Sequence, residues 1–150
     1  MSAHLPRHLV SGSASASHLS AMEAAHEQVE TCVVIFEAII AEKLSDVGKF
    51  SSARLRLRQA NVARTHAALN ASRHLISAAD RDSDLLGLYQ QELEQSQAVS
   101  RHVQLWNLDK IQKNWDGYCQ ATRRILRGIR ELVALEKRLL CSPLRNRLRR

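Results

Sequence analysis

The sequence predicts an all-α fold, namely an antiparallel up-and-down four-helix bundle. Five glycines and two prolines in 150 residues leave few turn signals, so long helices are the expected default. Apolar residues recur at alternating intervals of three and four over four long segments, which is the period of an amphipathic helix. Short polar joints separate the segments, and none shows the strict alternation that favours a β-strand. The length fits a single domain.

The first helix is expected from about His18 to Lys43. Its apolar or small positions form one stripe: Met22, His26, Val29, Val33, Phe36 and Ile40. The opposite face is expected to be solvated and acidic because glutamates occupy it: Glu23, Glu27, Glu30, Glu37 and Glu42. A turn is predicted at 46–49 around Gly48, and Ser51 or Ser52 can cap the helix that follows.

A second helix is predicted from about Ser52 to Ala79 and a third from about Ser83 to Trp106, separated by a polar break at 80–84. The stripe of the second helix is weak, since polar residues alternate with apolar ones: Leu55, Gln59, Val62, His66, Leu69, Arg73 and Ile76. The third helix continues at the same spacing: Leu85, Tyr89, Glu92, Ser96, Val99, Val103 and Trp106.

The fourth helix follows a short joint at 107–109 and has the clearest stripe of the chain. Its positions are Ile111, Trp115, Tyr118, Thr122, Ile125, Ile129, Leu132, Glu136 and Leu139. Pro143 is expected to end this helix, because proline removes a backbone donor and clashes with the preceding turn. Each of the four helices can then present one face to a shared core.

These segments predict a flexible N-terminal tail at 1–18, a bundle domain at 19–144 and a basic C-terminal tail at 145–150. The first eighteen residues have no continuous apolar block, so no secretory signal is expected. The longest apolar run, at 32–41, is interrupted by Glu37 and is far shorter than the roughly 20 residues of a membrane span. Three widely spaced cysteines favour a reduced, cytoplasmic compartment, with Cys32 and Cys119 as small core residues.

Polar residues on the apolar stripes are the candidate site. They are His26, His66, Glu92 and Glu136, one on each predicted helix. Bundles build metal sites from imidazole and carboxylate groups that converge between facing helices, so these four residues are candidate metal ligands. The alternative is a hydrogen-bonded polar layer, because a buried histidine or glutamate without a partner costs several kcal/mol, on the order of 2–7.

Three parts of the sequence share a pattern with a known family: His26 in the first helix, His66 in the second, and scattered positions from residue 106 onwards, namely Trp106, Ile111, Trp115, Tyr118, Arg123, Arg124, Glu136, Lys137, Leu139 and Pro143. On these residues the chain resembles the bacterial hemerythrin-like domains over roughly 20–144, with His66 as the start of the family's His-x-x-x-Glu motif. It implies a four-helix bundle with a non-heme di-iron centre held by histidines and bridging carboxylates. It further implies a role in oxygen storage, transport or sensing, or in signalling.

Two departures from the family pattern weaken the ligand set. Asn70 stands four residues after His66 where the motif requires glutamate, and Leu132 stands four residues before Glu136 where a histidine would be needed. Neither side chain can replace the missing ligand, so we expect a degenerate site without a cofactor, with non-heme iron as the alternative. Neither His66 nor His74 has the lysine and glycine that follow the histidine of phosphotransfer domains.

The net charge of +7 is unevenly distributed along the chain. Residues 1–50 sum to −3, 51–79 to +5, 80–116 to −3 and 117–150 to +8. The basic segments could bind nucleic acid or an anionic membrane surface, or they could pair with the acidic helices within the bundle or in an oligomer. The arginines concerned are Arg123, Arg124, Arg127 and Arg130 on the last helix and Arg145, Arg147, Arg149 and Arg150 at its end.

Together these patterns predict a protein that is not an enzyme. We expect a regulatory or protein-interaction module that recognises a protein partner, or a second copy, through a charged helix face. One alternative is a metal-binding oxygen or redox sensor or carrier that uses His26, His66, Glu92 and Glu136. The other is a basic helical protein that binds nucleic acid.

Overall fold

The structure, a computed structural model, describes residues 7–78 and 83–149 of the chain. The helices are α1 (Arg7–Ile40), α2 (Val47–Ala78), α3 (Ser83–Leu105), α4 (Leu108–Lys113), α5 (Trp115–Glu136), the π-helical turn η1 (Lys137–Cys141) and α6 (Ser142–Leu148). No strand occurs in either described range, which confirms the all-α prediction. None of these helices is both long enough and apolar enough to span a membrane.

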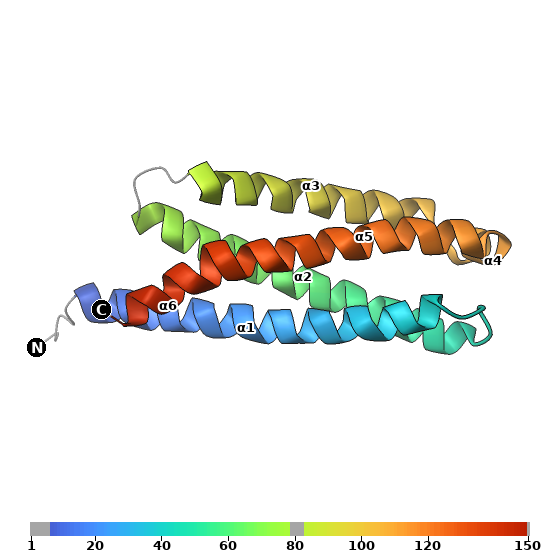
Figure 1. Cartoon of the computed structure of the whole chain (residues 1–150), viewed down its shortest axis with the longest axis horizontal. Helices are drawn as coiled ribbons and strands as arrows, with labels where there is room; N and C mark the ends of the chain where they lie inside the picture. The colour runs from blue at the N-terminus through green and yellow to red at the C-terminus, as the bar shows by residue number, and fades with distance from the viewer. Residues whose placement is uncertain (1–6, 79–82, 150) are drawn as a thin grey trace, which may run out of the picture.

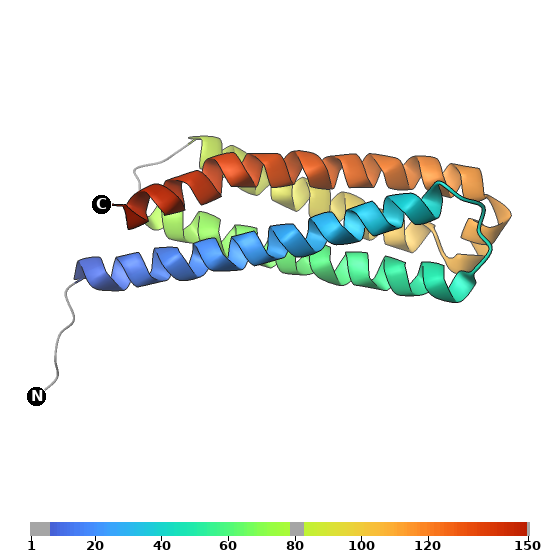
Figure 2. The ribbon, with the colours of Figure 1, turned by 60° about the horizontal axis from the view of Figure 1, so that its bottom comes forward.

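The four long helices α1, α2, α3 and α5 lie side by side in an elongated molecule (Figures 1 and 2). The start of α1 and the short helix α6 lie at one end, and α4 lies at the other, beside the connection between α1 and α2. At that end the indole Nε1 of Trp115 donates to the backbone oxygen of Glu42 at 3.0 Å. This bond links the start of α5 to the connection that follows α1.

The apolar core consists of two clusters with polar side chains between them. One cluster contains Val29, Phe36, Leu57, Ala60 and Tyr118, with Cys119 buried in it and Cys32 half-buried against it. The other contains residues near the opposite end: Leu19, Met22, Ala68, Ala71, Leu75, Leu88, Leu140 and Leu144. Along α1, His26 lies between Met22 and Val29, and along α2, Arg64 lies between Ala60 and Ala68. The polar layer therefore crosses the middle of the molecule.

The N-terminal segment differs from the expected flexible tail. Helix α1 begins at Arg7, so the part of 1–18 that the structure describes is helical, whereas 1–6 lies outside the described residues. The side chain of Ser15 is fully buried and its Oγ lies 3.0 Å from His74 Nε2 of α2. Small serine and alanine side chains let this segment approach α2 closely, a tertiary contact that the local pattern does not reveal.

The predicted stripe of α2 is wrong by about half a turn. Leu55 and Val62, which were expected in the core, are 55% and 51% exposed. The buried positions of α2 lie on another face, which includes four small side chains, Ala60, Ala68, Ala71 and Ser72, together with Phe50, Leu57, Asn61, Arg64 and Leu75. These residues also recur at intervals of three and four, so periodicity alone permits either face. Packing against α1 selects the face whose small side chains allow close approach.

The segment predicted as the last helix consists of four elements, with α4 before α5 and with η1 and α6 after it. Asn107 and Asn114 cap α4 and α5, since their side-chain oxygens accept from Lys110 N at 2.9 Å and Gly117 N at 3.0 Å. Pro143 does not end the helical path, because it lies in the first turn of α6, where a missing backbone donor costs nothing. The expected tail at 145–150 is thus helical through Leu148.

The turn between the first two helices also lies earlier than predicted. Helix α2 begins at Val47, so Gly48 belongs to its first turn rather than to the connection. Asp46 precedes the helix and its Oδ1 accepts from Lys49 N at 2.9 Å. Such a bond satisfies one of the free donors at a helix start, which explains why the helix begins there.

Candidate functional site: a buried ionic cluster

Three of the four predicted site residues meet in the polar layer. His26 of α1, Glu92 of α3 and Glu136 of α5 are at most 3% exposed, and all three belong to one hydrogen-bonded cluster. The fourth member of the cluster is Arg64 of α2, which is 1% exposed. Each of the four long helices therefore contributes one polar side chain.

Arg64 is the centre of this buried cluster. Its Nη1 donates to Glu136 Oε2 and to both carboxyl oxygens of Glu92, at 3.3 and 3.2 Å. Its Nε donates to Asn61 Oδ1 at 3.0 Å, and its Nη2 donates to Thr65 Oγ1 at 3.3 Å. All three guanidinium nitrogens are thus engaged by acceptors, as a buried arginine requires.

Glu136 connects its own helix, α5, to both α1 and α2. One carboxyl oxygen accepts from Arg64, and the other lies 2.9 Å from His26 Nε2. No buried side-chain nitrogen or oxygen of the described residues lacks a hydrogen-bond partner. The cluster is therefore closed on itself, which corresponds to the polar layer expected as the alternative to a metal site.

The surroundings set the protonation of the cluster. Burial raises the pKa of Glu92 to about 9, and the hydrogen bond with Glu136 and the negative charge of Glu136 act in the same direction. Burial also raises the pKa of Glu136, which Arg64 and the bond to Glu92 oppose. Burial and the nearby Lys137 lower the pKa of His26 to about 4. At neutral pH, Glu92 is therefore protonated and His26 is neutral, and the charge of Arg64 favours the ionised form of Glu136.

His66 does not join the cluster, contrary to the prediction. Its side chain is exposed on α2, in accord with the half-turn error in the predicted stripe. Arg64, two residues earlier, takes the inward position instead. The sequence contains a signal for Arg64, because Leu57, Ala60, Ala68 and Ala71 continue the three-and-four spacing on both sides of it.

The cluster does not fit a di-iron centre. Its possible metal ligands are one imidazole and two carboxyls, and the guanidinium of Arg64 binds both carboxyls from between them. A positive charge at that point repels a second cation and occupies the oxygens that would bridge two irons. No group of three or more histidine, cysteine, aspartate or glutamate side chains in the described part of the chain is arranged to hold a metal ion.

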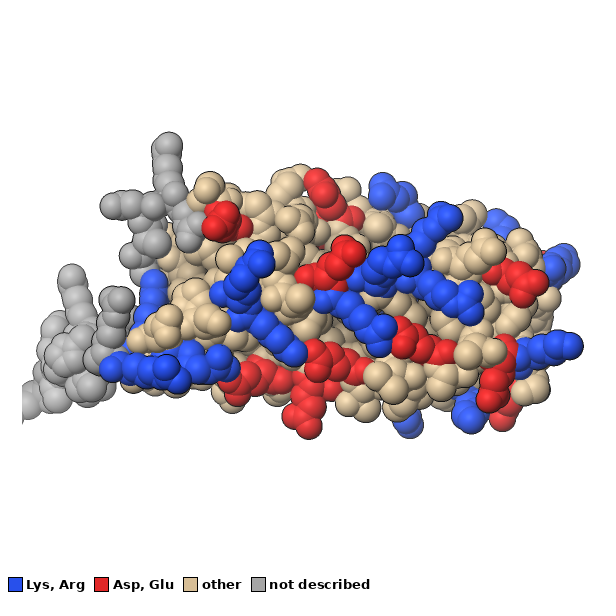
Figure 3. Space-filling view, in the orientation of Figure 1, with Lys and Arg blue, Asp and Glu red and all other residues tan. Residues whose placement is uncertain are grey.

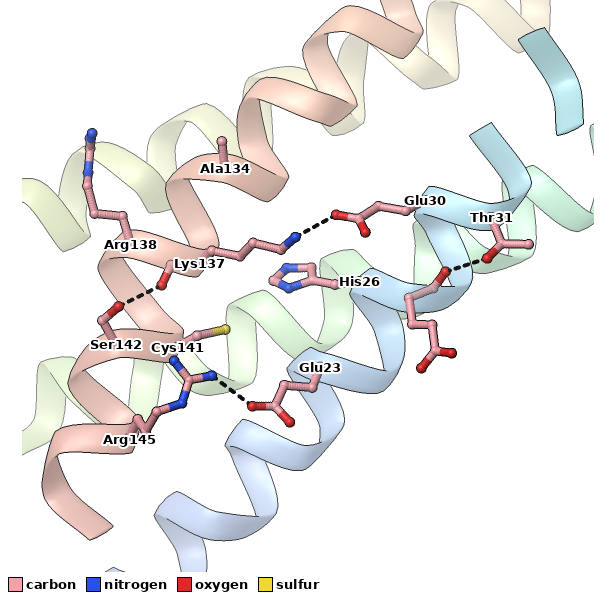
Figure 4. Close-up of a pocket in the computed structure, with 11 residues that line it drawn as sticks. Glu23, His26, Glu30, Thr31, Ala134, Lys137, Arg138, Cys141, Ser142 and Arg145 are labelled. Atoms are coloured by element: carbon pink, nitrogen blue, oxygen red, sulfur yellow. Dashed lines mark hydrogen bonds and ion pairs between the residues drawn. The ribbon is translucent and has the colours of Figure 1, made fainter. Parts of the chain in front are cut away.

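A surface cavity of about 660 Å³ lies next to the cluster, between α1 and the η1–α6 region. Figure 4 shows His26 directed from α1 towards this cavity, with ion pairs above and below it. Lys137 contacts Glu30 at 2.7 Å, and Arg145 contacts Glu23 at 2.9 Å. The cavity is thus bordered by paired charges of both signs.

Three ion pairs align α1 with the C-terminal half of the chain. They are Glu37 with Arg130, Glu30 with Lys137, and Glu23 with Arg145. The glutamates are seven residues apart, whereas their partners are seven and then eight apart. The π-helical turn η1 contains the extra residue, and the Oγ of Ser142, the first residue of α6, donates to Lys137 O at 3.2 Å. This turn keeps the third pair in register.

These three pairs account for part of the positive charge in the C-terminal segment of the sequence. Arg130, Lys137 and Arg145 neutralise acidic residues of α1, as the within-bundle alternative predicted. Arg123, Arg124 and Arg127 of α5 are exposed and form no ion pair with any acidic residue of ranges 7–78 and 83–149. We call these three residues the α5 arginine face.

Compared with protein-family models, curated proteins and solved structures, the chain matches none.

Proposed function

We propose that this chain is a non-catalytic interaction module that binds an acidic segment of a partner protein through the α5 arginine face. The observation that favours this function is a difference in pairing between two sets of basic residues in the chain from α5 to α6. Arg130, Lys137 and Arg145 are neutralised by α1, whereas the α5 arginine face has no acidic partner in the described ranges. In Figure 3, blue side chains lie over α5 and red ones along α1.

The proposed scaffold is an antiparallel up-and-down four-helix bundle similar to hemerythrin-like domains. Its support is the side-by-side arrangement of α1, α2, α3 and α5 (Figures 1 and 2), together with two ion pairs by which α1 runs opposite to the chain from α5 into η1. In this proposal Arg64 has taken the place of the metal. The guanidinium of Arg64 donates to the two carboxyl groups that would otherwise bind iron, and the bundle retains its polar layer without a cofactor.

The α5 arginine face suits a carboxylate-rich partner. Arg123 and Arg127 are one helical turn apart, and Arg124 lies beside them on the same outer surface. Arginine binds carboxylates through two parallel hydrogen bonds, which gives a geometric preference in addition to charge attraction. A rim of such contacts steers an acidic partner and determines its orientation.

The direct test is fluorescence anisotropy with a fluorescein-labelled poly-glutamate peptide. Replacing the face with R123E, R124E and R127E together should weaken binding at least about tenfold, because three attractions become repulsions. The matched control is R56E, R73E and R101E, which changes the net charge equally at exposed arginines of α2 and α3. It should change binding less than about twofold, since those residues lie outside the face.

Three outcomes would overturn the proposal. Equal losses in the two triple variants would mean that net charge, rather than the α5 arginine face, governs binding. Tight binding of duplex DNA without binding of poly-glutamate would favour the nucleic-acid alternative, with affinity falling steeply as salt increases. Stoichiometric uptake of iron by the protein purified without a histidine tag would favour the oxygen or redox alternative.

A further inference from the structure

We propose that a second cavity, between α2, α3 and α5, binds a small aromatic carboxylate. The aromatic ring would lie against Tyr118 and Trp106, and the carboxylate would bind Arg54 and Arg58. This ligand site is separate from the α5 arginine face, so either proposal can fail without the other. The cavity has a volume of about 340 Å³, which is at the small end of the range for ligand pockets.

The position of the cavity follows from the course of the helices. Figure 1 shows α2 and α3 diverging towards the end of the molecule that contains α4. Val99 and Val103 of α3 form one wall, Leu55 and Leu57 of α2 form another, and Leu108 of α4 lies at the end. The apolar side chains on these walls would exclude water from a bound ring.

Aromatic residues concentrate at the end of the molecule that contains this cavity, and Phe36, Trp106 and Tyr118 line it. Five of the chain's six phenylalanine, tyrosine and tryptophan residues gather at this end: Phe36, Phe50, Trp106, Trp115 and Tyr118. Tyr118 is central, with the rings of His102 and Trp106 centred 5.6 and 5.7 Å from its own. Offset or edge-on contacts with such rings favour an aromatic ligand over an aliphatic one of equal volume.

The charged groups of the cavity favour an anion. Arg54 and Arg58 line it, no acidic side chain does, and neither arginine forms an ion pair with an acidic residue of the described chain. Arg54 Nη2 donates to Trp106 O at 2.7 Å, and its guanidinium carbon lies 5.8 Å from the centre of the Tyr118 ring. This anchoring holds the guanidinium in place, and its remaining N–H groups can bind a carboxylate.

Two further groups could orient the ligand. Thr122 Oγ1 lies 3.3 Å from His102 Nε2, and both residues line the cavity. Burial and the charge of Arg54 lower the pKa of His102, so the imidazole is neutral and adds no second positive charge deep in the cavity. The positive groups are therefore restricted to Arg54 and Arg58, which suits a monoanion with an apolar body.

The test is isothermal titration calorimetry of the full chain with 2-naphthoate and its neutral analogue 2-naphthamide. The carboxylate should bind at least about tenfold more tightly than the amide, since its charge-assisted bonds are lost in the analogue. Arg58→Gln should remove this preference without changing the affinity for 2-naphthamide. Arg56→Gln, an exposed arginine of α2 outside the cavity lining, is the matched control and should retain the preference.

A second variant tests the location independently of charge. Val103→Phe should fill the cavity and weaken both ligands at least about tenfold, whereas Val34→Phe on the exposed face of α1 should change neither. In NMR spectra, 2-naphthoate should shift the indole signal of Trp106, which lines the cavity, more than that of Trp115, which does not. Absence of binding at millimolar 2-naphthoate, equal affinities of the two ligands, or insensitivity to Val103→Phe would overturn the proposal.

Discussion

His26 Nε2 lies 2.9 Å from Glu136 Oε1 and joins α1 to α5 across 110 residues of sequence. The same carboxyl group accepts from Arg64 through its other oxygen, so one side chain connects three helices. Because the polar layer formed by these residues lies between two apolar clusters, a change in its charge should alter the stability of the whole core. The predictions below follow from that balance and from the packing around it.

Arg64→Met should reduce the free energy of unfolding by about 3–5 kcal/mol, because it leaves Glu136 buried without its cation. The exposed Arg56→Met is the matched control and should change it by less than about 0.5 kcal/mol. Urea denaturation followed by circular dichroism measures both. A loss below about 1 kcal/mol for Arg64→Met would show that the arginine does not hold the cluster together.

Removing the ionisable carboxyl groups should compensate for the loss of the arginine. We expect Arg64→Met combined with Glu92→Gln and Glu136→Gln to be more stable than Arg64→Met alone, by about 1–3 kcal/mol, because no carboxyl group that can ionise remains buried without its cation. The same urea titrations give the comparison. A triple variant less stable than the single variant would contradict a charge-balance role for the cluster.

Glu92 should make the protein less stable as the pH rises from 6.5 to 9. Its pKa is about 9 in the folded chain and 4.5 as its ordinary value, so the folded state holds a proton that the unfolded state has released. Stability therefore falls with rising pH over this interval, by about 3 kcal/mol at most. Glu92→Gln should flatten this part of the profile, whereas the exposed Glu94→Gln should keep the wild-type slope.

His26 should make the protein less stable as the pH falls from 6.5 towards 4. Its pKa is lowered from 6.5 to about 4, so between these values the unfolded state binds a proton that the folded state does not. The stability due to this neutral imidazole is complete above pH 6.5 and is lost as the pH falls through about 4, amounting to about 3 kcal/mol. NMR titration of the His26 ring, assigned with His26→Gln, should give a midpoint near 4. A midpoint near 6.5 would contradict burial of the uncharged ring.

Ala71→Leu should destabilise the bundle by about 1–3 kcal/mol, because Ala71 is fully buried and has no room for a larger side chain. Ala63→Leu places the same side chain on the exposed face of α2 and should change stability by less than about 0.5 kcal/mol. Thermal unfolding distinguishes the two. Equal effects would indicate that the buried face of α2 is assigned incorrectly.

The helical periodicity of the sequence predicts much of the core without any knowledge of tertiary contacts. The predicted stripe of α1 is buried at Met22, His26, Val29, Val33, Phe36 and Ile40, and most of the α5 stripe is buried as well. In these helices most of the large apolar residues lie on one side, although Val34 and Ile35 of α1 are exposed, so one face can be buried favourably. For the same reason His26, Glu92 and Glu136 could be selected from the sequence as buried polar groups.

Tertiary structure alone decided the inward face of α2 and, with it, the composition of the site. Leu55 and Val62 define one possible face, whereas Ala60, Ala68 and Ala71 define another. The burial of apolar area favours the first face, but close packing against α1 requires the small side chains of the second. That choice turns Arg64 inward and His66 outward. The sequence by itself determined that polar groups of α1, α3 and α5 occupy buried positions, and the packing of α2 determined that Arg64, rather than His66, joins them.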